Sequence, residues 1–141
     1  GTLPNLGLPH LTLLDLSKNQ LDNVESLGAS RMENINILYL SYNQLTVLPI
    51  LDCPCLEVYS FTHNRLKNIS EMAKSKIPKL KRVRALNNQI EGSFPRMDFL
   101  ELQQLHIEDN KITSLDTLAQ CQIPMIERLT LSRNALQGSL P

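Results

Sequence analysis

The sequence contains six 11-residue segments that share one pattern, and each segment has asparagine at its ninth position. The segments are LTLLDLSKNQL (11–21), INILYLSYNQL (35–45), LEVYSFTHNRL (56–66), LKRVRALNNQI (80–90), LQQLHIEDNKI (102–112) and IERLTLSRNAL (126–136). Their asparagines lie 24, 21, 24, 22 and 24 residues apart along the 141-residue chain. Self-similarity at such a period is typical of arrays whose units pack mainly against their neighbours. We therefore expect one repeat array.

Each segment reads L-x-x-L-x-L-x-x-N-x-L, with Ile, Val, Tyr, Phe or Ala as occasional stand-ins for Leu. The third to seventh positions alternate as the side chains of a β-strand do. Apolar positions four and six should point into a shared core, and positions three, five and seven should point away from it. The chain must turn after position seven, where an asparagine amide can hydrogen-bond backbone groups that the turn leaves free. We predict short parallel strands and a buried ladder of asparagines. Its members are Asn19, Asn43, Asn64, Asn88, Asn110 and Asn134.

The connections between segments alternate between long and short, which gives a second period of 45 or 46 residues. The long connections place Gly28, Ala73 and Ala119 at one equivalent position, where close packing between neighbouring units would require a small residue. All eight prolines lie in connections, where the missing backbone N–H is tolerated. We expect turns, 3₁₀ pieces or short helical pieces in the long connections.

The pattern resembles the leucine-rich repeat family over essentially the whole chain. The resemblance implies an α/β fold: a right-handed solenoid with a curved parallel sheet of about six short strands on its concave side. Turns, 3₁₀ or short helical pieces would form the convex side. Residues 1–141 would then be a single domain of six repeats, or three superrepeats. Because GTLP and GSLP stand at equivalent points at the two ends, we expect a window of a longer array.

The long repeats resemble the intracellular class found in the regulatory subunit of type-one protein phosphatase. The stretches NQIEGSFP (88–95) and NALQGSLP (134–141) resemble plant-type receptor turns instead. Three cysteines, an odd number, favour a reducing compartment over a secreted disulfide framework. We expect an intracellular, cytoplasmic protein, with an extracellular one as the alternative because Asn68 begins a single N-x-S sequon.

The composition argues against several functions. Fourteen basic and fourteen acidic residues give a net charge of zero, which makes nucleic-acid binding unlikely, and no apolar run is long enough for a membrane span. No known catalytic motif occurs. His63 and His106 fall two strands apart, about 10 Å, which is too far for one zinc ion. We expect no enzyme activity, small-molecule substrate, cofactor or metal, and the oligomeric state stays open.

Positions three, five, seven and eight, which point out of the sheet, carry the candidate binding residues. The first three segments present aliphatic and tyrosine side chains, which are typical of interface hot spots. The fourth adds two arginines. The predicted partner-binding residues are Leu13, Ile37, Tyr39, Tyr42, Val58, His63, Arg82, Arg84, Leu86 and His106. Scattered exposed apolar residues also occur without any function, so an ordinary solvated surface is the competing interpretation.

A basic cluster, KSKIPKLKRVR (74–84), could dock an acidic or phosphorylated segment. The favoured interpretation is a solvated face that Glu57, Glu101 and Glu108 partly neutralise. The leading hypothesis for the whole chain is a non-catalytic module that binds a protein partner on its concave sheet. The alternatives are a structural subunit of a large intracellular assembly (ciliary, cytoskeletal or spliceosomal) and a fragment of an extracellular receptor ectodomain.

Overall fold

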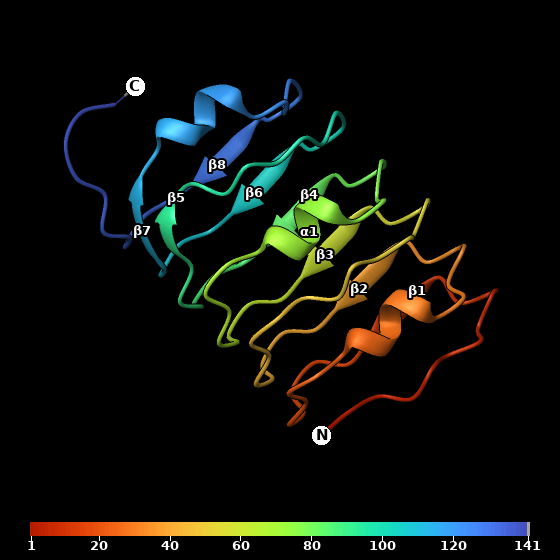
Figure 1. The fold of residues 1–141 in the computed structure, drawn as a ribbon. Coiled ribbons are helices and arrows are strands. Elements are labelled where there is room, and N and C mark those ends of the chain that lie inside the picture. The colour runs from red at the N-terminus through yellow and green to blue at the C-terminus, as the bar shows by residue number, and fades with distance from the viewer. Residues whose placement is uncertain (141) are drawn as a thin grey trace.

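The computed structural model describes residues 1–140 and is built on a six-stranded parallel sheet (Figure 1). The strands are β1 (Leu13–Asp15), β2 (Ile37–Tyr39), β3 (Val58–Ser60), β4 (Arg82–Arg84), β6 (Gln104–His106) and β8 (Arg128–Thr130). They lie side by side in chain order, and equivalent positions of the six segments are paired in register. The predicted sheet of six short parallel strands is confirmed, and the protein is of the mixed α/β class.

Alternate side chains of the sheet enter the core, as the period of two requires. At position four, Leu38, Tyr59, Val83 and Leu105 are fully buried. Leu14, in β1, is only half-buried because β1 has a neighbouring strand on one side alone. The core therefore runs the length of the sheet, from strand to strand.

The asparagines form a hydrogen-bonded ladder beside the sheet. Asn64 is typical: its Nδ2 donates to the carbonyl oxygens of Phe61 and Leu40, each 3.0 Å away. Its Oδ1 accepts a 3.0 Å bond from the backbone N–H of Leu45. The four central members are confirmed as buried: Asn43, Asn64, Asn88 and Asn110. Asn134 is half-buried. The prediction of burial is wrong for Asn19, which is exposed because no earlier segment covers it.

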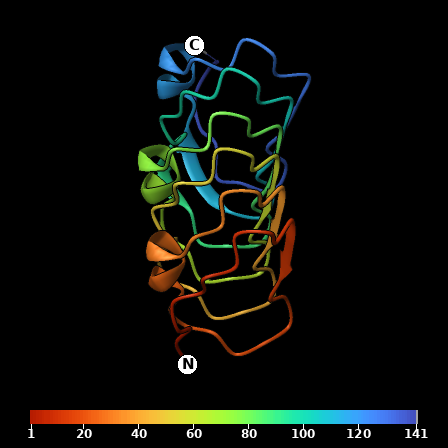
Figure 2. The same ribbon diagram turned by 90° about the vertical axis from the view of Figure 1, so that its right-hand side faces the viewer.

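Three helical segments occupy the long connections, as predicted. They are the 3₁₀ helices η1 (Glu25–Ala29) and η2 (Asp116–Gln120) and the short α-helix α1 (Ser70–Lys74). Figure 2 shows all three on the side of the molecule opposite the sheet. A Cβ atom on Gly28 would lie 2.6 Å from the carbonyl oxygen of Ile50, which confirms the close contact predicted there. Pro141, the last proline assigned to a connection, lies outside the described residues.

A second, two-stranded parallel sheet was not predicted. It pairs β5 (Glu91–Ser93) with β7 (Lys111–Ser114), just after the fourth and fifth ladder asparagines. Its register shifts between Gly92 and Ser93, where Gly92 adopts φ +79°. Among residues 1–140, every helix falls short of the length and hydrophobicity that crossing a bilayer requires.

The residue before each ladder asparagine has a left-handed backbone, which the sequence did not predict because none of these residues is glycine. They are Lys18, Tyr42, His63, Asn87, Asp109 and Arg133, with φ between 54° and 58°. The left-handed conformation costs an ordinary residue about 1–2 kcal/mol. Hydrogen bonds hold the backbone on both sides of this conformation. At Tyr42, for example, the backbone N–H donates to the Thr62 carbonyl oxygen at 2.9 Å, and the side chain of the next residue, Asn43, donates to the Leu16 carbonyl oxygen. We call these six positions the left-handed rim.

Candidate functional site

The outer face of the six-stranded sheet is the surface that points away from the core. Strand register sorts its side chains into rows that cross all six strands. The row from position three is Leu13, Ile37, Val58, Arg82, Gln104 and Arg128. The row from position five is Asp15, Tyr39, Ser60, Arg84, His106 and Thr130. Each row changes from uncharged side chains at β2 and β3 to arginine at β4.

The first half of the outer face is largely apolar, with Asp15 of β1 as an exposed acid. Leu13, Ile37 and Val58 are neighbours by register; Leu13 is 46% exposed, and the other two are half-buried. Tyr39 is half-buried in the next row, while Tyr42 on the rim is 49% exposed. We call these five residues the apolar half. The structure thus brings together five of the predicted binding residues.

His63 is held between two other rim residues. Its ring stacks on Tyr42, with centroids 4.3 Å apart and planes 10° apart. Its Nε2 lies 3.1 Å from Nδ2 of Asn87, and its Nδ1 is buried without a hydrogen-bond partner. The contacts bring two predicted binding residues, Tyr42 and His63, into one stack. Asn87 was missed from the sequence, although its place in the pattern matches that of His63.

Two serines lie beneath the apolar half. Ser41 and Ser60 occupy outward positions, yet both are buried and their hydroxyls are hydrogen-bonded at 2.8 Å. Ser41 Oγ also accepts the backbone N–H of Thr62 at 3.1 Å. Ser60 is 7% exposed, so it offers a partner little surface although its position points outward. Neither serine hydrogen-bonds a histidine, so the geometry of an activated nucleophile is missing here.

Arginines define the second half of the outer face. Arg82 and Arg84 are exposed on β4, and Leu86 beyond them is half-buried. Neither arginine forms an ion pair within residues 1–140. Glu57 partly neutralises the basic cluster, as predicted, through an ion pair with Lys81 at 2.7 Å. The hydrogen bond between Lys81 and Glu57 holds the pKa of the Glu57 carboxyl below its usual range.

His106 is restrained by polar neighbours on β6 and β8. Its Nδ1 lies 3.0 Å from Thr130 Oγ1 and 3.6 Å from Glu108 Oε1, and its Nε2 lies 3.4 Å from Gln104 Oε1. The other carboxylate oxygen of Glu108 is buried without a partner. In the described part of the chain, no three histidine, cysteine or acidic residues gather closely enough to hold a metal ion.

Rim residues at the far end also pair with each other. Arg133 donates to the Asp109 carboxylate, with Nη2 2.8 Å from Oδ2. That hydrogen bond is the main cause that lowers the Asp109 carboxyl pKa. Asp109 is therefore already neutralised by Arg133.

The three cysteines are free thiols away from the outer face. Cys53 is buried, while Cys55 and Cys121 are half-buried. Burial, aided by the nearby Asp52 charge, raises the pKa of the Cys53 thiol to about 11. A thiol that stays protonated at neutral pH is a poor nucleophile.

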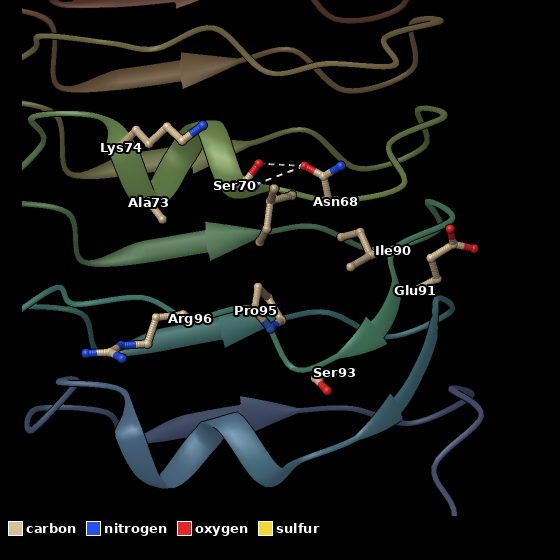
Figure 3. A pocket seen from close by; sticks show the side chains of 10 residues that line it. Asn68, Ser70, Ala73, Lys74, Ile90, Glu91, Ser93, Pro95 and Arg96 are labelled. Carbon is tan, nitrogen blue, oxygen red and sulfur yellow. Dashed lines mark hydrogen bonds between the residues drawn. The ribbon is translucent and has the colours of Figure 1, made fainter.

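A cavity of about 330 Å³ opens on the helix side, between α1 and β5 (Figure 3). Ile69, Ala73, Ile90 and Pro95 contribute apolar surface to its walls. The Ser70 hydroxyl at its rim donates to Asn68 Oδ1 at 2.8 Å. Its lining residues in the described chain include Glu91, Lys74 and Arg96 but neither histidine nor cysteine. The sequence pattern did not predict this cavity.

Comparisons with known proteins found nothing similar: no family model, no curated protein and no solved structure matches this chain.

Proposed function

We propose that the chain is a leucine-rich repeat solenoid and a non-catalytic module that binds a partner protein on the outer face of its six-stranded sheet. Support for the solenoid comes from two regularities. Equivalent positions of the six segments pair in register, and one asparagine hydrogen-bonding pattern recurs from segment to segment.

The observation that carries the binding proposal is the continuous apolar half of the outer face. Three aliphatic side chains lie on consecutive strands, and two tyrosines adjoin them. Tyrosine supplies much contact area for little conformational entropy, and it is enriched in interface hot spots. Hydrogen-bonded strands hold these side chains in place before a partner arrives, which lowers the entropic cost of binding.

The proposal is non-catalytic because the serines and His106 of the outer face already contact other protein groups. Ser41 and Ser60 bond each other, and the His106 ring faces Thr130, Glu108 and Gln104. We also propose an intracellular, cytoplasmic location, for which the free thiols provide support.

The proposal can be tested with ligands selected from a displayed library of random linear peptides. The best peptide is titrated against wild type and the Tyr39→Ala/Tyr42→Ala variant by fluorescence anisotropy. Loss of two hot-spot side chains should weaken binding by about 30-fold or more. The matched control is Val47→Ala/Ile50→Ala, which truncates two exposed apolar residues in a connection and should leave affinity unchanged. Equal affinity of wild type and the tyrosine variant would contradict the proposed surface.

A further inference from the structure

We propose that the segment bound on the outer face is acidic, with its carboxylates placed against Arg82, Arg84 and Arg128 and its apolar side chains against the neighbouring apolar half. This inference rests on the proposed function and adds the chemistry of the partner. We call the three arginines the basic half.

Strand geometry places the three arginines close together. Arg82 and Arg84 are alternate residues of β4 and point to the same face, about 7 Å apart along the strand. Arg128 shares a row with Arg82, with Gln104 of β6 between them. Two strand spacings separate Arg82 from Arg128, about 10 Å. One short peptide can therefore reach all three guanidinium groups.

The charges of the basic half are unmatched. Arg82, Arg84 and Arg128 are all exposed, and in the 140 residues that the structure describes none has a carboxylate within ion-pair distance. Within residues 1–140, Glu57 pairs with Lys81, Asp98 with Arg96 and Asp109 with Arg133, so these three acids are already engaged elsewhere. Glu108, an acid of the outer face, lies beside His106 and is buried.

Carboxylates complement the three guanidinium groups of the basic half well. A guanidinium presents a planar set of donors that matches a carboxylate in two-point geometry, and charged hydrogen bonds are roughly twice as strong as neutral ones. A partner carboxylate would also relieve the repulsion among three like charges on adjacent strands. The surface therefore favours an anionic ligand at this half and disfavours a cationic one.

The apolar half begins one strand away from the basic half. Arg82 pairs with Val58 in the position-three row, and Val58 pairs with Ile37. A segment that follows this row meets aliphatic side chains and then guanidinium groups. The row crosses five strand spacings, about 24 Å, which an extended chain of about seven residues can cover. The expected ligand is thus an extended peptide with acidic residues next to apolar ones.

Nucleic acid is the other anionic ligand to consider, and the surface favours it less. Single-stranded nucleic acid is usually held by aromatic side chains interleaved with basic ones. Here both outer-face tyrosines lie in the apolar half, while Gln104 lies between Arg82 and Arg128. A net charge of zero also provides no long-range attraction to a phosphate backbone.

The experiment repeats the peptide selection on three proteins and sequences the bound pools. The test variant is Arg82→Gln/Arg84→Gln/Arg128→Gln, and the charge-matched control is Lys67→Gln/Lys74→Gln/Lys76→Gln, whose exposed lysines lie in a long connection. Wild type and the control should enrich peptides with Asp or Glu adjacent to aliphatic or aromatic residues. The arginine variant should enrich apolar peptides without that acidic bias. One acidic peptide should bind the arginine variant at least about 10-fold more weakly than wild type.

The outcomes separate this inference from the proposed function. Enrichment of apolar peptides without acidic bias on wild type, with binding lost in Tyr39→Ala/Tyr42→Ala, would overturn the acidic partner and leave the binding surface standing. Peptides that bind wild type and the tyrosine variant equally would overturn the surface itself. Saturable binding of a single-stranded oligothymidylate, lost in the arginine variant and tighter than that of the acidic peptide, would assign the basic half to nucleic acid and also overturn the inference.

Discussion

The imidazole ring of His63 stacks on the phenol ring of Tyr42, with centroids 4.3 Å apart and planes inclined by only 10°. Both residues precede a ladder asparagine, and both have a left-handed backbone. Strand register brings equivalent rim positions together, so the two rings meet although they are 21 residues apart in sequence. The stack links the apolar half of the outer face to the edge where the chain leaves the sheet.

The stack should appear as a coupling in a double-mutant cycle. We expect Tyr42→Asn and His63→Asn to be non-additive, with a coupling of about 0.5–1.5 kcal/mol in favour of the wild-type pair. Asparagine is chosen because it tolerates the left-handed conformation, so the substitutions add little backbone strain. Urea unfolding of the four proteins measures the coupling, and additive effects would contradict a stabilising stack.

Replacing Lys18 with glycine should stabilise the folded state. Its φ is 58° and its side chain is exposed, so the native residue bears a conformational cost that glycine avoids. We expect Lys18→Gly to raise the free energy of unfolding by about 0.5–1 kcal/mol. This net value includes the cost of the greater conformational entropy that glycine gives the unfolded chain. Lys79→Gly is the control, because Lys79 is exposed but is not among the positive-φ residues; it should destabilise. A loss of stability in Lys18→Gly would contradict the explanation.

Replacing a central ladder asparagine should lower the free energy of unfolding far more than replacing the first one. Asn88 accepts the N–H of Leu66 at 3.2 Å and donates to Phe61 O at 3.1 Å, and it is buried. Asn88→Ala would leave these groups without partners, at a cost of about 2–4 kcal/mol. Asn19 is exposed, so Asn19→Ala should cost under about 1 kcal/mol. Denaturant unfolding compares the two variants, and equal losses would mean that burial of the ladder contributes little.

Gly28 should not tolerate even alanine. The added Cβ would meet the Ile50 carbonyl oxygen at 2.6 Å, so the backbone of η1 or of its neighbour would have to shift. We expect Gly28→Ala to lower the unfolding free energy by about 1–3 kcal/mol, despite the better helix propensity of alanine. Gly7→Ala provides the matched comparison because nothing lies within 4 Å of its added Cβ, and its effect should stay within about 0.5 kcal/mol.

Stability should fall at alkaline pH because buried groups resist losing a proton. Burial raises the Cys53 pKa from an ordinary value near 9.0 to about 11, so the folded state holds this proton more tightly than the unfolded state. That contribution is complete below pH 9 and is lost as pH rises toward 11, by on the order of 2 kcal/mol. Burial also raises the pKa of the Tyr59 hydroxyl, which acts in the same direction.

The free energy of unfolding, measured across this alkaline range, tests the argument. Cys53→Ala should show a shallower decline with pH than wild type, and Cys53→Ala/Tyr59→Phe a shallower one still. The test compares slopes, because both variants also lose packing contacts. Parallel curves for wild type and Cys53→Ala would show that this thiol does not hold its proton more tightly in the folded state.

The sequence alone predicted the strands and the ladder because these depend on local chemistry. Alternation of apolar residues selects a strand with one buried side, and an asparagine after each strand can satisfy the backbone of a turn. Leu38 and Asn64 illustrate both predictions, since each is buried where its place in the pattern put it. Gly28 was also predictable, because a small residue at a fixed place implies a close neighbour.

Other features needed the tertiary structure because they arise between segments. The left-handed rim could not be predicted from residue type, because hydrogen bonds from neighbouring strands hold lysine, tyrosine and arginine in this conformation. The pairing of β5 with β7, the burial of Ser60 and the Tyr42–His63 stack likewise depend on which segments lie side by side. The period of the chain determined that strands and ladder would form. Register determined which side chains became neighbours, because contact between distant residues is set by the packing of whole segments.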